Sequence, residues 1–144
     1  YDEMVRLMQQ GLKANPGNPD LVDALIVGFL QTGREKQALE WMEKALKDRP
    51  GDVDLMMRLA ELADRQGETE RAAQVYQRVL DQKPDHEKAR QALVRLLLDR
   101  GQRQEASEDL DAALATYKKV LELAPGTEAA EEAYLRLRLK RMSQ

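Results

Sequence analysis

A spacing of 34 residues recurs along the chain and constrains the fold more than any other feature. Glycine, leucine and proline each recur at this interval, and the positions involved are Gly33, Gly67 and Gly101, Leu25, Leu59 and Leu93, and Pro16, Pro50 and Pro84. A fixed period of about 20–50 residues is typical of a repeat array in which each unit packs on its neighbours. The sequence therefore predicts stacked copies of one small structural unit.

Two antiparallel helices account for one such period. Leu and Ala together number 40 of the 144 residues, whereas Val, Ile and Thr number 13, and this ratio favours helix over strand. Glycine tolerates the left-handed backbone at a helix end, and proline cannot continue a helix. We therefore expect each periodic glycine, including Gly101, to end a first helix and each proline to end a second. The expected helices are 1–14, 19–31 with 35–48, 53–65 with 69–82, 87–99 with a helix that ends near Leu123, and about 128–141.

These positions resemble the tetratricopeptide repeat (TPR). The matching residues are Leu25, Gly33, Ala38, Met42, Ala45 and Pro50 in one repeat, and Leu59, Gly67, Ala72, Tyr76, Val79 and Pro84 in the next. The resemblance implies an all-α fold, an α-solenoid in which antiparallel helix pairs form a right-handed superhelix. Val22, Met56 and Arg90 replace the large aromatic residue that is usual early in the first helix, so Arg90 must snorkel or pair.

One solenoid domain is expected to cover residues 1–144. Its parts are 1–18, the second half of a truncated repeat; the repeats 19–52 and 53–86; 87–127, a repeat with a seven-residue insertion; and 128–144, a terminal helix with Thr127 as its N-cap. We expect the insertion to give one helix from near Arg103 to Leu123. The alternative is a short turn and a new helix capped by Ser107. The incomplete first repeat suggests a fragment of a longer TPR array.

Composition argues against several functional classes. Lys and Arg number 23 against 26 Asp and Glu, so the clustered positive charge of a nucleic-acid-binding protein is not expected. The sequence has no cysteine and a single histidine, His86, which we place in a turn. No catalytic constellation, metal site or cofactor is therefore predicted, and the protein is not expected to be an enzyme. No apolar run is long enough for membrane insertion, and both a cytoplasmic and a bacterial periplasmic location are compatible with the sequence.

Helical rotation identifies a candidate binding surface. In helix 19–31 the residues Val22, Leu25, Ile26 and Phe29 form one apolar stripe, and the opposite side carries acidic residues. The resemblance implies that this opposite side lines a concave groove for a peptide or a partner helix. The predicted groove residues are Asp20, Asp23, Val27, Leu30, Asp54, Met57, Glu61, Asp64, Lys88, Gln91, Arg95 and Leu98. The groove would pass from acidic to basic along the chain, with Val27, Leu30, Met57 and Leu98 as exposed apolar contacts.

The predicted function is a protein- or peptide-binding scaffold that assembles a multi-protein complex. Its partner would carry a basic-amphipathic segment complementary to the acidic half of the groove. The clamp that binds chaperone C-termini in this family is disfavoured, because Asp23, Val27 and Arg58 stand where it needs Lys and Asn. The alternative is a structural spacer in a longer TPR superhelix, as in bacterial envelope-assembly or polysaccharide-secretion machines. Apolar residues on the two end helices also predict weak self-association.

Overall fold

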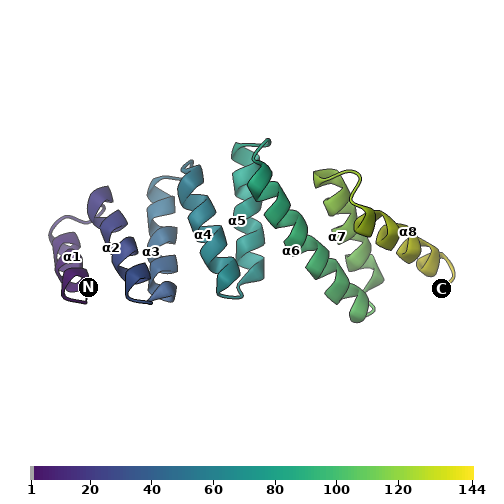
Figure 1. The fold of residues 1–144 in the computed structure, drawn as a ribbon, viewed down its shortest axis with the longest axis horizontal. Coiled ribbons are helices and arrows are strands. Elements are labelled where there is room, and N and C mark those ends of the chain that lie inside the picture. Colours follow the sequence, from purple (N-terminus) through teal and green to yellow (C-terminus); the bar gives the residue numbers. More distant parts are fainter. Residues whose placement is uncertain (1) are drawn as a thin grey trace. The chain divides into compact units, whose positions relative to one another are not determined.

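A computed structural model describes residues 2–144, and all regular structure in that range is α-helical (Figure 1). The helices are α1 (Asp2–Ala14), α2 (Pro19–Gln31), α3 (Glu35–Asp48), α4 (Val53–Arg65), α5 (Thr69–Gln82), α6 (Glu87–Ala106), α7 (Leu110–Leu123) and α8 (Glu128–Met142). This confirms the predicted all-α helical-repeat solenoid. The right-handed superhelical twist stays a prediction.

The chain divides into two compact units, and the division falls after Val75, within α5. In the first unit α1 packs on α2, α2 on α3, and α3 on α4. In the second unit α6 packs on α7, and α7 on α8. Within each unit these helices therefore pack on their neighbours in sequence, which is the arrangement that a helical repeat requires.

Local sequence signals set the helix boundaries in the first unit. Asn18 is the N-cap of α2, and its side-chain oxygen accepts hydrogen bonds from the backbone nitrogens of Asp20 and Leu21 at 3.0 and 3.3 Å. Gly33 and Gly67 follow the first helices of their repeats with φ angles of +75° and +80°. This left-handed backbone ends each helix at the predicted position.

The core of the first unit follows the predicted stripe. Val22, Leu25, Ile26 and Phe29 are all buried. Met56 is also buried, although it replaces the large aromatic residue of the repeat.

Arg90, in the second unit, also replaces the large aromatic residue of the repeat, and its side chain pairs with neighbouring polar groups. Its guanidinium donates to Glu87 Oε2 at 2.9 Å and to the carbonyl oxygen of Pro84 at 2.8 Å. The expectation that Arg90 snorkels or pairs is therefore confirmed.

The seven-residue insertion lies in α6, and two expectations about it are wrong. The helix expected from Arg103 to Leu123 is interrupted, because α6 continues to Ala106 and α7 begins at Leu110. The alternative with a turn was correct in kind, but the N-cap is Asp109, two residues beyond Ser107. Gly101 does not end a helix: it is buried within α6.

Contacts from α7 and α8 explain why α6 continues past Gly101. The ring of Tyr117 lies on Gly101, so closely that a Cβ atom at Gly101 would be 2.8 Å from Tyr117 Cζ. The Tyr117 hydroxyl donates to Glu105 Oε1 at 2.6 Å, and Arg136 of α8 pairs with Glu105 at 3.1 Å. Burial and this hydrogen bond both raise the pKa of Tyr117. Tyr117 is thus a packing residue that holds the added turns of α6 in place.

Thr127 occupies the predicted N-cap position of α8 but does not cap it through its side chain. Its hydroxyl instead donates to the carbonyl oxygen of Ala124 at 2.7 Å.

Candidate groove site

A depression with a volume of about 260 Å³ lies between α2, α3 and α4 in the first unit. It lies on α2 and α4, the first helices of two successive repeats. Its lining residues are Asp23, Ile26 and Val27 on α2, Met42 on α3, Arg49 directly after α3, Asp52 directly before α4, and Asp54, Leu55 and Arg58 on α4. We call this the α2–α4 depression. It brings together the predicted groove residues Asp23, Val27 and Asp54.

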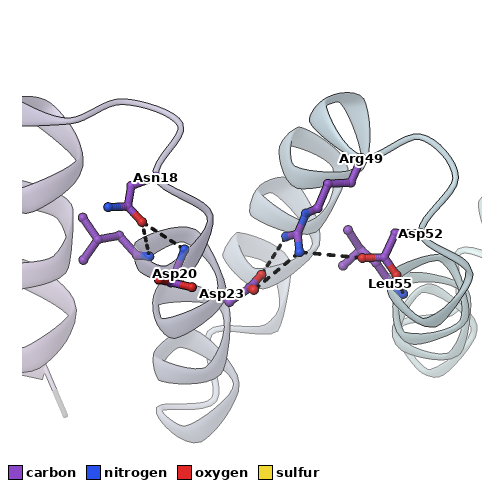
Figure 2. A network of polar contacts seen from close by, with 7 residues as sticks. Asn18, Asp20, Asp23, Arg49, Asp52 and Leu55 are labelled. Atoms are coloured by element: carbon purple, nitrogen blue, oxygen red, sulfur yellow. Dashed lines mark hydrogen bonds and ion pairs between the residues drawn. The ribbon is translucent and has the colours of Figure 1, made fainter.

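Arg49 connects the two walls of the α2–α4 depression (Figure 2). Its guanidinium donates to both carboxylate oxygens of Asp23, at 2.7 and 3.4 Å, and lies 3.6 Å from Asp52 Oδ2. The other oxygen of Asp52 accepts a hydrogen bond from the Leu55 nitrogen at 3.1 Å and so caps α4. One arginine therefore ties the side of α2 to the N-terminus of α4.

This network changes the charge that the depression presents. The hydrogen bond from Arg49 to Asp23 raises the pKa of the guanidinium. Asp23 is consequently part of an ion pair rather than a free acidic contact. Asp54 and Arg58 are exposed at the edge, and the depression is mixed in charge instead of uniformly acidic.

Sequence reasoning missed Arg49 as a groove residue. A weak signal was present, because Lys83 stands one period after Arg49 and each precedes a proline. Arg49 has a carboxylate partner in Asp23. The residue one period after Asp23 is Met57, so Lys83 has no carboxylate at the equivalent position. The ion pair thus depends on a contact between helices that the repeat spacing does not encode.

The other predicted groove residues of the first unit fall into two groups. Exposed side chains are Asp20, Asp23 and Val27 on α2 and Asp54 and Glu61 on α4, whereas Leu30 and Asp64 are half-buried. Met57 is 8% exposed, so the expectation that it is an exposed contact is wrong. Its long apolar side chain lies in the core rather than at the surface.

The basic part of the predicted groove lies in the second unit. Lys88, Gln91 and Arg95 are exposed on α6, and Leu98 is half-buried. The passage from an acidic to a basic groove stays a prediction. On α8, Arg136 pairs with Glu105, and Arg141 lies 2.6 Å from Asp111.

Residues that could support chemistry are placed in structural roles. His86 is the N-cap of α6, and its Nδ1 accepts a hydrogen bond from the Ala89 nitrogen at 3.1 Å. Within residues 2–144, no group of three or more His, Asp or Glu side chains is arranged to hold a metal ion. No helix in that range is both long enough and apolar enough to span a membrane.

Sequence comparison assigns the repeat. Models of the tetratricopeptide repeat match residues 24–87 and 88–125. The chain belongs to the tetratricopeptide-repeat family. No curated protein sequence gave a significant match.

Solved TPR structures share the fold at low sequence identity. MamA AMB-1 superposes with a TM-score of 0.57 at 21% identity, over 85% of this chain and 63% of MamA. YrrB, a TPR protein with an unusual peptide-binding site, gives a TM-score of 0.55 at 19% identity, over 90% of this chain and 63% of YrrB. The chain thus spans less than two thirds of the length of these relatives. The likeness establishes the fold.

Proposed function

We propose that this TPR protein is an interaction scaffold that binds a peptide segment of a partner in the α2–α4 depression. Members of the family are typically non-catalytic interaction modules. The observation that carries the proposal is Val27, an apolar side chain that is 46% exposed among the charged residues of the depression. Ile26, Met42 and Leu55 also line the depression, and a concave surface that combines apolar side chains with a few polar groups is typical of binding sites.

The charges at the edge favour a ligand with basic and apolar residues. Asp20 and Asp54 are exposed carboxylates on the two helices that carry the depression. They would attract a basic segment and orient it, while apolar contacts with Val27 would slow its dissociation. Arg58 is exposed at the same edge and would donate hydrogen bonds to a backbone carbonyl or a single carboxylate of the ligand.

A single substitution at Val27 tests the site. Peptides selected from a displayed random library against the wild-type protein should be rich in Lys or Arg and in apolar residues. Val27→Arg should weaken their binding by about tenfold or more, because it places a cation in the apolar contact and repels a basic ligand. Isothermal titration calorimetry measures the loss.

The matched control is Gln37→Arg, which adds the same charge at an exposed position of α3 outside the depression. It should leave the affinity within about twofold of the wild-type value. Equal binding by the Val27→Arg variant would show that the selected peptides bind elsewhere. Met57→Ala is not a suitable test, because truncation of this buried side chain destabilises the fold itself.

A structural spacer within a longer superhelix is the second candidate, and exposed apolar residues on α1 and α8 favour it. Met4 and Leu7 on α1 are 49% and 57% exposed, and Leu135, Leu139 and Met142 on α8 are 60%, 69% and 78% exposed. Such residues would pack against another helix in an extended array.

The spacer candidate predicts weak self-association through α8. Light scattering should give an average mass for the wild-type protein that rises with concentration, and Leu135→Glu with Leu139→Glu should abolish the rise. Both positions are exposed, so the double variant should retain its helical circular dichroism. A wild-type mass that stays monomeric throughout would contradict this role for α8.

A further inference from the structure

A second depression lies between α1 and α3. Its volume is about 470 Å³, and its lining residues are Arg6, Gln9, Gln10, Leu12, Lys13 and Trp41. We call it the α1–α3 pocket. It shares no lining residue with the α2–α4 depression, and all of its residues belong to the first unit.

Trp41 gives the α1–α3 pocket its apolar wall. Trp41 is half-buried, and the lining also includes the buried Leu12. Lys44 Nζ lies 4.4 Å from the centroid of the Trp41 ring, a cation–π contact that holds a positive charge beside the indole. The pocket thus combines an apolar surface with an adjacent cation.

The polar residues of the α1–α3 pocket are cations and amides. Arg6 and Lys13 are seven residues apart, which places them on the same side of α1. Arg6 lies 3.9 Å from Glu3, but both side chains are more than two thirds exposed, so this pair is weak. Among the described residues that line the pocket there is no carboxylate. The pocket is therefore positive where the α2–α4 depression is mixed.

We propose that the α1–α3 pocket binds an acidic peptide segment that inserts one aliphatic or aromatic side chain. The volume is in the usual range for ligand sites, about 300–1,000 Å³, and accommodates one large side chain. That side chain would contact Leu12 and Trp41, while flanking carboxylates pair with Arg6 and Lys13. Gln9 and Gln10 can each donate to and accept from the peptide backbone.

A nucleic acid fits this pocket less well. Single-stranded nucleic acids bind along a positive groove with several aromatic platforms. The α1–α3 pocket offers one aromatic residue, Trp41, and two lining cations, in a chain with a formal charge of −3. An acidic peptide requires only local positive charge and one apolar anchor.

Trp41 is the single tryptophan of the chain, so its fluorescence reports directly on the site. The probe is a short capped peptide of Glu and Ser with one central Phe. It should change the Trp41 emission in a saturable way, and the affinity should fall as salt is added. A peptide with Ser in place of Phe, a peptide with Lys in place of Glu, and a thymidine oligonucleotide should each bind at least about tenfold more weakly.

Charge reversal assigns the contact to the pocket. Arg6→Glu with Lys13→Glu should weaken the Phe peptide by about tenfold or more, measured by fluorescence and by calorimetry. Lys36→Glu with Lys47→Glu makes the same change in charge at exposed positions of α3 outside the pocket and should have less than about a twofold effect. If the double Glu variant loses its helical circular dichroism, Arg6→Gln with Lys13→Gln replaces it.

Three results would overturn the proposal. They are equal binding of the Ser-substituted peptide, tighter binding of the oligonucleotide, and wild-type affinity in a folded variant of Arg6 and Lys13. Val27→Arg should leave this interaction unchanged, because Val27 does not line the α1–α3 pocket. Failure of the acidic-peptide proposal and failure of the groove function are therefore distinguishable.

Discussion

Leu59→Ala should reduce the free energy of unfolding by about 2–5 kcal/mol, because it leaves a cavity that the packed helices cannot fill. Leu59 is 1% exposed on α4, at a position that recurs with the 34-residue period. Domains of this kind are stable by only about 5–15 kcal/mol in total, so the loss is a large fraction. Chemical denaturation followed by far-ultraviolet circular dichroism should show a lower midpoint with a similar slope.

Leu7→Ala is the matched control for this prediction. It makes the same chemical change on α1, at a side chain that is 57% exposed. Surface substitutions of this kind usually change stability by less than about 0.5 kcal/mol. Equal midpoints for Leu59→Ala and the wild-type protein would contradict the view that Leu59 is a core residue on which the first unit depends.

The sequence predicted most of the helix boundaries because the residues that end helices are local signals. Gly33 and Gly67 adopt the left-handed backbone at the predicted bends, and the bounds of α2, α3, α4 and α5 coincide with the predicted ranges. Glycine and proline act through their own backbone restrictions, so their effect does not depend on distant contacts.

The insertion could not be placed from sequence because seven residues preserve the helical phase. Seven steps of 100° fall only about 20° short of two full turns, so the apolar stripe stays aligned whether α6 or α7 is lengthened. The deciding contact is the packing of Tyr117 on Gly101, which joins residues on different helices. A local pattern carries no record of such a contact.

The candidate groove shows a related limit. Asp23 and Met57 are one period apart, so the repeat predicts equivalent positions for them on α2 and α4. Asp23 is exposed and pairs with Arg49, whereas Met57 is buried. The period predicts the direction of a side chain, but the chemistry of that side chain decides whether it packs against its neighbours or faces water.

Gly101→Ala should destabilise the second unit, whereas the same change within a helix normally stabilises a protein by up to about 1 kcal/mol. The new methyl group would lie 2.8 Å from Tyr117 Cζ and 2.9 Å from Cε1. Tyr117 is 2% exposed and is held by its hydrogen bond to Glu105, so the ring cannot turn aside freely. Overpacking of this kind costs about 1–3 kcal/mol, which exceeds the gain in helix propensity.

Gly11→Ala is the control that isolates the clash, because Gly11 also lies within a helix. Its added Cβ would lie 3.3 Å from Leu21 Cδ1, the end of a flexible side chain. We therefore expect Gly11→Ala to leave the denaturation midpoint unchanged or raise it, and Gly101→Ala to lower it.

A double variant tests whether the ring of Tyr117 causes the loss. When Gly101→Ala is added to a Tyr117→Leu variant, it should recover part of the stability that Tyr117→Leu removes, since the ring that would clash is absent. If Gly101→Ala instead stabilises the protein as Gly11→Ala does, Tyr117 does not require glycine beneath it. The lengthening of α6 would then depend on the polar contacts of Glu105 with Tyr117 and Arg136.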